Sequence, residues 1–158
     1  MIFFSKHKES DELLYSKLFD ETNFYKRFLK DLKNAKNEVI IESPYITSTR
    51  MEVLTPVFQR LLHKKVKIHL FTRDPAEHEG DFIHQATNEI LICSDMGINV
   101  VLQNGLHHRK IAIIDRQILW EGRLNILSHT RSKEIMRRIE GKQPAREMFG
   151  FLKLHTVI

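Results

Sequence analysis

The sequence predicts an α/β fold in which a mixed β-sheet is flanked by helices on both faces. Short apolar runs typical of strands alternate with segments whose apolar residues recur every three to four positions, as in amphipathic helices. The last third changes rhythm and contains closely spaced strands that indicate a hairpin. With 158 residues, about the length of one domain, and no Gly/Ser/Pro-rich linker, the chain is expected to form a single domain over residues 1–158.

The first part of the chain predicts two helices and a strand. Residues 11–19 form a short amphipathic helix through Leu14 and Leu18. A second helix begins at the cap-like Thr22 or Asn23 and ends at the polar residues 33–37. Its apolar stripe consists of Phe24, Phe28, Leu29 and Leu32. Residues 38–42 (EVIIE) then predict a strand that leads into a loop.

The middle of the chain predicts helix, strand, loop, helix and strand. The first helix carries the apolar stripe Met51, Leu54, Phe58, Leu61 and Leu62. A strand follows at residues 67–72, and the polar residues 73–81 indicate a loop or lid. The second helix carries Phe82, Ala86, Ile90 and Leu91. A third strand near residues 99–102 completes a pattern of alternating strands and helices, which is typical of a sheet covered by helices.

The final third predicts a hairpin, a further strand and a helix. Residues 110–114 (KIAII) read as a buried strand, residues 115–117 as a turn, and residues 117–121 as the returning strand. Another strand is expected near residues 135–139, followed by a helix entered at Pro144. Phe149 and Phe151 are expected to pack this helix rather than to stack on bases.

Composition excludes several classes of protein. No apolar run approaches the ~20 residues that a membrane-spanning helix needs, and charged residues interrupt the N-terminal MIFF too early for a signal peptide. The single cysteine, Cys93, cannot form an internal disulfide, and no cysteine pair offers a zinc or iron–sulfur site. We therefore expect a cytoplasmic protein without a membrane partner.

The charge distribution points to a polyanionic partner. The net charge is +5, and residues 123–153 alone contain eight basic and three acidic side chains, an excess of +5. A basic surface attracts phosphates and releases their counterions, which favours nucleic acid as a partner. A solvated basic face without a ligand is the alternative interpretation.

One cluster of residues has the chemistry of a phosphodiester site. His108 and Lys110 are two residues apart at the start of a predicted strand, so both side chains project from the same face. An imidazole nucleophile and an ammonium can then share one pocket, and His107 points the opposite way. After the hairpin, Asn125 adds an amide donor and Gly122 allows close approach of backbone. Such groups supply the nucleophile, positive charge and proton donor that phosphodiester cleavage needs.

The spacing His108-x-Lys110-x4-Asp115, followed by Gly122 and Asn125, resembles the HKD signature and downstream G-S-x-N of the phospholipase D superfamily. The resemblance extends over about residues 24–140. It implies a phospholipase D-like α/β/α sandwich. The stretch from Lys110 to residue 140 is especially similar to phospholipase D-like domains attached to bacterial DNA helicases, which implies a helicase as a possible partner.

The resemblance also implies roles for single residues. His108 attacks phosphorus to give a phosphohistidine, while Lys110 and Asn125 bind phosphate oxygens. Glu134 resembles the downstream glutamate that orients the histidine through its other ring nitrogen and thereby fixes its tautomer. Asp115 is chiefly structural in this family and orders the turn after the strand.

Further residues are expected to bind substrate. Arg123 stands where the signature has serine, and it either supplies an additional phosphate contact or fills the pocket and silences the site. Arg131 belongs to the same basic stretch. Tyr45 follows the first core strand, as do Thr47 and Arg50, at the position where open α/β sheets place ligands. An ordinary strand-to-helix loop is the alternative for these three residues.

The chain contains a single HKD element, whereas phospholipase D chemistry uses two histidines, one as nucleophile and one as general acid. A symmetric homodimer would place two copies of His108 in one composite pocket, as the resemblance to single-motif nucleases implies. This reading predicts a nuclease that requires no metal or other cofactor. A metal site could be suggested by His78, Glu79 and His84, but their spacing suits no single helix face. A solvated lid is the preferred interpretation of this segment.

Two alternatives to a nuclease remain. The first is a noncatalytic nucleic-acid-binding module of a helicase or repair system, in which Arg123 has replaced activity with affinity. The second is a phospholipase or phosphatidyltransferase, which uses similar chemistry. Such enzymes usually have two motifs and an apolar membrane-binding surface, and neither is visible in the sequence.

Overall fold

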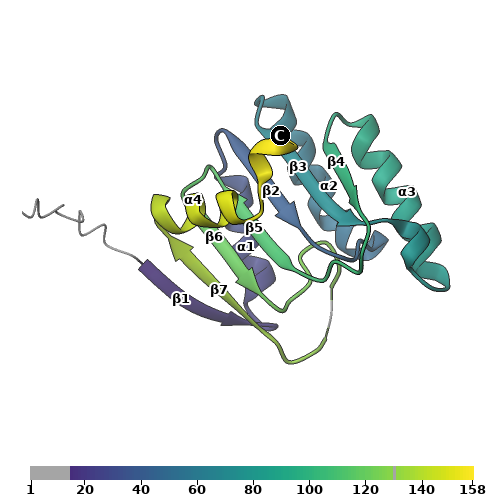
Figure 1. Cartoon of the computed structure of the whole chain (residues 1–158), viewed down its shortest axis with the longest axis horizontal. Coiled ribbons are helices and arrows are strands. Elements are labelled where there is room, and N and C mark those ends of the chain that lie inside the picture. Colours follow the sequence, from purple (N-terminus) through teal and green to yellow (C-terminus); the bar gives the residue numbers. More distant parts are fainter. Residues whose placement is uncertain (1–14, 130) are drawn as a thin grey trace, which may run out of the picture.

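A computed structural model describes residues 15–129 and 131–158. Within this part of the chain, seven strands form one sheet in the order β1-β7-β6-β5-β2-β3-β4 (Figure 1). The strands are β1 (Tyr15–Asp20), β2 (Glu38–Glu42), β3 (Lys67–Arg73), β4 (Asn99–Gln103), β5 (Lys110–Ile114), β6 (Ile118–Gly122) and β7 (Ile135–Glu140). The helices are α1 (Phe24–Lys33), α2 (Ser48–His63), α3 (Asp81–Asp95) and α4 (Lys142–Phe151), and the short 3-10 helices are η1 (Pro75–Glu77) and η2 (Leu154–Thr156).

The sheet is mixed, as predicted. Strands β2, β3 and β4 are parallel to one another, whereas β5 pairs with β2 in the antiparallel sense. The remaining strands β6, β7 and β1 continue the antiparallel half. Helices connect the parallel strands because such strands need a crossover, and a tight turn connects β5 to β6.

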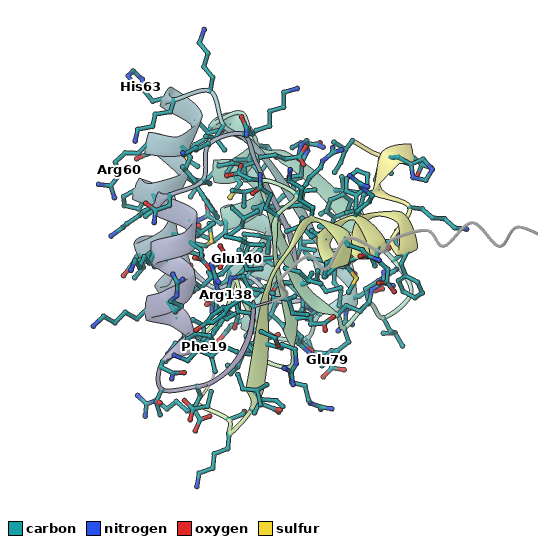
Figure 2. All side chains as sticks on the ribbon, turned by 90° about the vertical axis from the view of Figure 1, so that its left-hand side faces the viewer. Phe19, Arg60, His63, Glu79, Arg138 and Glu140 are labelled. Carbon is teal, nitrogen blue, oxygen red and sulfur yellow. The ribbon has the colours of Figure 1, made fainter. Side chains whose placement is uncertain are left out.

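Helices cover both faces of the sheet, which confirms the predicted layers. Helices α1, α2 and α3 pack their apolar stripes on one face, in a core that includes Phe28, Phe58 and Trp120. Helix α4 and η2 cover the other face through Ala145 and Leu154. Figure 2 shows α4 on the opposite side of the sheet from α1 and α2. Each large apolar side chain buried in these layers contributes about 1.5–3 kcal/mol.

The helix predicted for residues 11–19 is wrong over its described part. Residues 15–20 form β1, which pairs with β7 at the edge of the sheet, and residues 11–14 lie outside the described residues. The spacing of Leu14 and Leu18 suggested a helix, but Leu18 is half-exposed. Phe19 is the buried residue, and its ring lies 5.0 Å from that of Trp120. Pairing with β7 therefore overrides the local pattern.

A buried ion pair fastens α1 to the antiparallel half of the sheet. Asp31 accepts hydrogen bonds from Arg138 at 2.7 Å and 3.1 Å and from the Trp120 indole at 2.9 Å. Arg138 also donates to Glu140 at 3.0 Å, and the two side chains lie next to each other in Figure 2. Arg138 was counted in the basic C-terminal stretch, but it is only 5% exposed. It therefore adds no surface charge for a polyanion.

The C-terminal helix corrects a second expectation. Phe149 packs against the α4 core and lies under the guanidinium of Arg116, at 4.2 Å from the ring centroid. Phe151, in contrast, is 74% exposed and does not pack the helix. Among the described residues, no helix combines the length and apolar character needed to cross a bilayer.

Candidate active site

Except for Asp115, the residues of the predicted site lie at one end of the sheet. Strands β2 and β3 run parallel and finish there, at Glu42 and Arg73. Strand β5 runs the opposite way, so Lys110 at its start pairs with Gly122 at the end of β6. The loops that follow β2, β3 and β6 and the loop that precedes β5 therefore meet at the same edge of the sheet, where α/β proteins place ligands.

His108 and Lys110 form the centre of the site. The Lys110 ammonium lies 2.7 Å from Nδ1 of His108, and Lys110 is buried while His108 remains exposed. The neighbouring residues Arg109 and His107 contact a different side chain, that of Glu42. Arg109 donates to the buried Glu42 at 2.9 Å, and His107 lies 3.9 Å from the same carboxylate. These contacts fix the orientation of the strand on its other face.

Positive charge surrounds the imidazole. Loss of hydration lowers the pKa of His108, and the cations Lys110, Arg73 and Arg123 lower it further. Burial and Arg123 also lower the pKa of Lys110, while Glu134 opposes this shift. His108 is therefore held neutral at lower pH than an ordinary imidazole, and a neutral imidazole is the nucleophilic form.

Asn125 belongs to a tightly fastened loop. The side-chain hydroxyl of Ser43, just after β2, accepts from the backbone N–H groups of Ile126 and Leu127. Arg50 donates to the carbonyl of Ile126 at 3.1 Å, and Tyr25 donates to the carbonyl of Asn125 at 3.0 Å. These bonds position Asn125 near the ends of β2 and β3, and none of them uses its side-chain amide.

Arg50 therefore holds this loop from within the structure. It is 5% exposed, and burial lowers its pKa to about 10. A position at the rim of the ligand pocket was one of the two expectations for Arg50. It is wrong, because Arg50 is buried in α2. Thr47 also acts on this loop through its backbone N–H, which donates to the carbonyl of Leu127 at 3.0 Å.

Arg123 and Glu134 form an ion pair with each other. The Arg123 Nε lies 3.1 Å from Glu134 Oε2, and the arginine side chain is 75% exposed. Arg123 therefore does not fill a buried pocket, which was one of the two interpretations of this position. Within the described residues, the carboxylate of Glu134 is paired with Arg123 rather than with His108.

Gly122 and Arg131 complete the predicted set. A Cβ at Gly122 would collide with the carbonyl oxygen of Ile135 and lie 2.8 Å from the sulfur of Met136. The close backbone approach that this glycine allows is therefore to strand β7. Arg131 is exposed in the loop between β6 and β7.

Asp115 lies at the opposite end of β5 from Lys110. Its carboxylate accepts hydrogen bonds from the backbone N–H groups of Lys36, Asn37 and Glu38, at 2.9, 2.7 and 3.0 Å. The third residue of the motif thus joins the α1–β2 connection to the β5–β6 turn. At this place the carboxylate orders the connection and lies away from Lys110.

A pocket of about 610 Å³ adjoins the site. Its lining includes Tyr45 and Asn125, together with three residues whose sequence pattern predicted no contact with substrate: Arg73, His78 and Phe82. The ring of Tyr45 stands edge-on to that of His108, with 6.0 Å between centroids. One signal for Arg73 was available, since it is the last residue of a strand whose carboxyl end faces the site.

In the described part of the chain, no group of three or more His, Cys, Asp or Glu side chains could hold a metal ion. His78 is buried against Tyr45, whereas Glu79 and His84 are exposed. The arrangement as a whole combines a neutral imidazole, an adjacent ammonium and further cations, which suits attack on a phosphoryl centre.

Comparisons with known proteins agree with this architecture. A family model described as "Cardiolipin synthase, PLD-like domain" matches residues 28–150. NucT from Helicobacter pylori aligns with a TM-score of 0.72 and 15% identity, covering 89% of this chain and 94% of that chain. Nuc from Salmonella typhimurium, a phospholipase D family member, aligns with a TM-score of 0.72 and 14% identity, covering 89% and 92%.

A phosphatidylserine synthase from Haemophilus influenzae aligns with a TM-score of 0.65 and 13% identity, covering 82% of this chain and 35% of that chain. At these identities the solved structures establish the fold. A search of curated proteins gave no match.

Proposed function

Because the chain belongs to the phospholipase D superfamily and contains its PLD-like domain, we propose that it is a phosphodiesterase that cleaves nucleic acid through a phosphohistidine at His108. The observation that carries the proposal is the contact between His108 and Lys110, at 2.7 Å, in the field of Arg73 and Arg123. A phosphodiester brings a negative charge that these cations attract, and its phosphorus then lies beside the imidazole.

The first chemical step requires a change of hydrogen-bond partner. A protonated Lys110 can only donate, so its contact with Nδ1 places the imidazole proton on Nε2. Attack by Nε2 needs the opposite tautomer. In this proposal the incoming phosphate draws Lys110 to a nonbridging oxygen, and Nδ1 then carries the proton. Nε2 attacks phosphorus, the bond to the leaving oxygen breaks, and water later hydrolyses the phosphohistidine.

Glu134 is the group that would accept from Nδ1–H of His108 in this reactive state. It is paired with Arg123 in the free protein, so the proposal requires that pair to open. Opening is inexpensive because exposed ion pairs contribute about 0–1 kcal/mol. Arg123 then turns to the substrate phosphate, and the exchange couples substrate binding to the orientation of His108.

The leaving oxygen needs a proton donor, and the proposal assigns this role to His108 of a second copy of the chain. Two copies related by a two-fold axis would share one pocket, with Lys110 and Asn125 of each copy binding nonbridging oxygens. Arg131, exposed in the loop after β6, would contact a flanking phosphate. DNA is the expected substrate, and a helicase is a possible physiological partner.

Cleavage in EDTA tests this proposal. Plasmid and single-stranded DNA are incubated with the wild-type protein and with His108→Ala, because phosphohistidine chemistry needs no metal ion. We expect cleavage by the wild type that His108→Ala abolishes. Cleavage that EDTA stops, or that the variant retains, would refute the mechanism.

A noncatalytic nucleic-acid-binding module is the second candidate. The ion pair between Arg123 and Glu134 favours it, since the arginine stands where the superfamily signature has serine and occupies the carboxylate that should orient His108. Salt-sensitive binding of DNA without cleavage would support this candidate. Restored cleavage in Arg123→Ser would show that the arginine is inhibitory.

A further inference from the structure

The pocket beside His108 has an aromatic wall. Tyr45 stacks on His78 with ring centroids 5.1 Å apart, and Phe82 lies 6.0 Å from Tyr45 in a tilted arrangement. His78 is buried, Tyr45 is half-buried, and Phe82 is 47% exposed although it occupies the first turn of α3. An exposed aromatic face in a pocket of about 610 Å³ offers a flat apolar surface to a small ligand.

The charges around this pocket differ from those around His108. Arg73 is already engaged, since it donates to the Tyr45 hydroxyl and to the carbonyl of Glu77. Glu77 and Glu79 also line the pocket, so its carboxylates outnumber its guanidinium. The pocket therefore suits a neutral group with hydrogen-bonding edges better than a second phosphate.

Polar atoms without partners gather in the same pocket. Five buried side-chain N or O atoms in the described part of the chain have no hydrogen-bond partner, and three of them belong to residues that line it: Arg73 Nε, His78 Nε2 and Asn125 Oδ1. Of these, Arg73 Nε lies 3.8 Å from Glu77 Oε1, in an ion pair but beyond hydrogen-bond distance. Arg73 and His78 are 8% and 7% exposed. Unsatisfied buried groups are rare and cost free energy, so their concentration beside a pocket indicates a polar ligand that completes them.

One residue of the pocket lining, Leu106, has an unfavourable backbone conformation. Leu106 is 73% exposed and has a φ of 58°, a region that bulky residues rarely adopt. The Glu77 carboxylate holds it there by accepting from the N–H groups of Gly105 and Leu106 at 3.0 and 3.2 Å. Such strain is typical of ligand-binding loops, and Leu106 lies only two residues before His108.

We propose that this pocket binds the base of the nucleotide next to the scissile phosphate, packed against Tyr45, Phe82 and Leu106. The proposal rests on the proposed function, since it adds a base site to the phosphate site at His108. A base is planar, neutral and edged with donors and acceptors, which matches the aromatic wall, the charges and the unpaired polar atoms. The stacking part of this contact accepts any base.

The base site has a consequence for the form of the substrate. A base inside a Watson–Crick duplex is stacked and paired, and it cannot enter a pocket without leaving the helix. Single-stranded nucleic acid pays little of this cost. The protein is therefore expected to cleave single strands faster than duplexes.

Two small esters isolate the contribution of the base. Thymidine 5′-(p-nitrophenyl phosphate) carries a base beside the scissile bond, and methyl p-nitrophenyl phosphate does not. We expect wild-type kcat/KM to be higher for the nucleotide ester. Phe82→Ala should lower this ratio about tenfold, as the loss of ~1.4 kcal/mol of stacking requires, and Phe82→Trp should restore it.

Phe151→Ala is the matched control, because Phe151 is also an exposed phenylalanine but lies at the end of α4, outside the pocket lining. Its ratio should equal that of the wild type. An unchanged ratio in Phe82→Ala would overturn the base site. A second result would also overturn the base site. If Phe82→Ala keeps the kcat/KM ratio of the two esters but no longer hydrolyses phosphatidylglycerol in mixed micelles, the pocket binds a lipid.

Failure of the proposed function has a different signature, because the wild type would then hydrolyse neither ester. The base site is tested in that case by binding. A single-stranded oligonucleotide containing 2-aminopurine should be quenched by the wild type through stacking, and Phe82→Ala should abolish the quenching while Phe151→Ala retains it. Equal quenching by all three proteins would refute the base site.

Discussion

Replacing Asp115 by alanine should destabilise the fold and leave the chemistry intact. Three backbone N–H groups donate to its carboxylate, and hydrogen bonds to charged groups contribute about 1.5–3 kcal/mol each. Two of these bonds are exposed, so water replaces them in the variant, and we expect a net loss of about 2–4 kcal/mol. The φ of 53° at this position adds ~1 kcal/mol, since alanine tolerates it less well than aspartate.

Thermal unfolding followed by the fluorescence of Trp120, the single tryptophan and fully buried, measures the effect. A loss of this size lowers Tm by roughly 6–20 °C for a domain of this length. Asp115→Asn should lose less, because it retains an acceptor and tolerates a positive φ. The exposed Asp95→Ala serves as the control, with an unchanged Tm.

The activity of Asp115→Ala decides the interpretation. Asp115 lies about 16 Å along β5 from Lys110, so kcat/KM of the folded variant at a temperature below its Tm should stay close to that of the wild type. A variant that unfolds like the wild type but has lost its activity would refute the structural role and place Asp115 in the chemistry.

Three further predictions follow from the site. Lys110→Ala and Asn125→Ala should each lower kcat/KM for a phosphodiester at least tenfold, on the order of 1.4 kcal/mol in transition-state stabilisation; unchanged rates in both would remove the phosphate pocket. The acidic limb of the pH profile of kcat/KM should lie below 6.5, because the reaction needs neutral His108 and the pKa of this residue is lowered. Arg123→Ser removes one of the cations that lower this pKa, so it should move the limb to higher pH. A limb that does not move would contradict the electrostatic account. Gly122→Ala should lower Tm because its Cβ meets the adjacent strand, at a cost of roughly 1–3 kcal/mol; thermal unfolding measures this, and an unchanged Tm would contradict the close packing.

The centre of the site was predictable because it depends on local spacing. Residues two apart on a strand share a face, so the contact between His108 and Lys110 follows from the sequence alone. The strands at residues 38–42 and 110–114 were also found with their observed bounds, since both are short apolar runs flanked by polar residues.

The rest of the site depends on tertiary contacts that spacing does not encode. Tyr45, Arg73 and Phe82 come from three separate segments and meet only because β2 and β3 end at the same edge. The pairing of Arg123 with Glu134 likewise joins residues on either side of a loop.

The same limit explains the two errors in the antiparallel half. Strand β1 is stabilised by its neighbour β7 rather than by its own pattern, so its residues resembled a helix. Arg138 counted as surface charge until the structure paired it with Asp31 from α1. Both cases involve partners more than a hundred residues apart, which composition and periodicity cannot detect.

The shared site is the central claim, and a mixing experiment tests it most directly. Wild-type protein is unfolded and refolded with increasing amounts of His108→Ala, and cleavage in EDTA is measured at constant total protein. If two copies of His108 act on one phosphorus, mixed dimers are inactive, and an equal mixture shows about a quarter of the activity of the same total amount of wild type. About half the activity, in proportion to the wild-type fraction, would contradict the shared site.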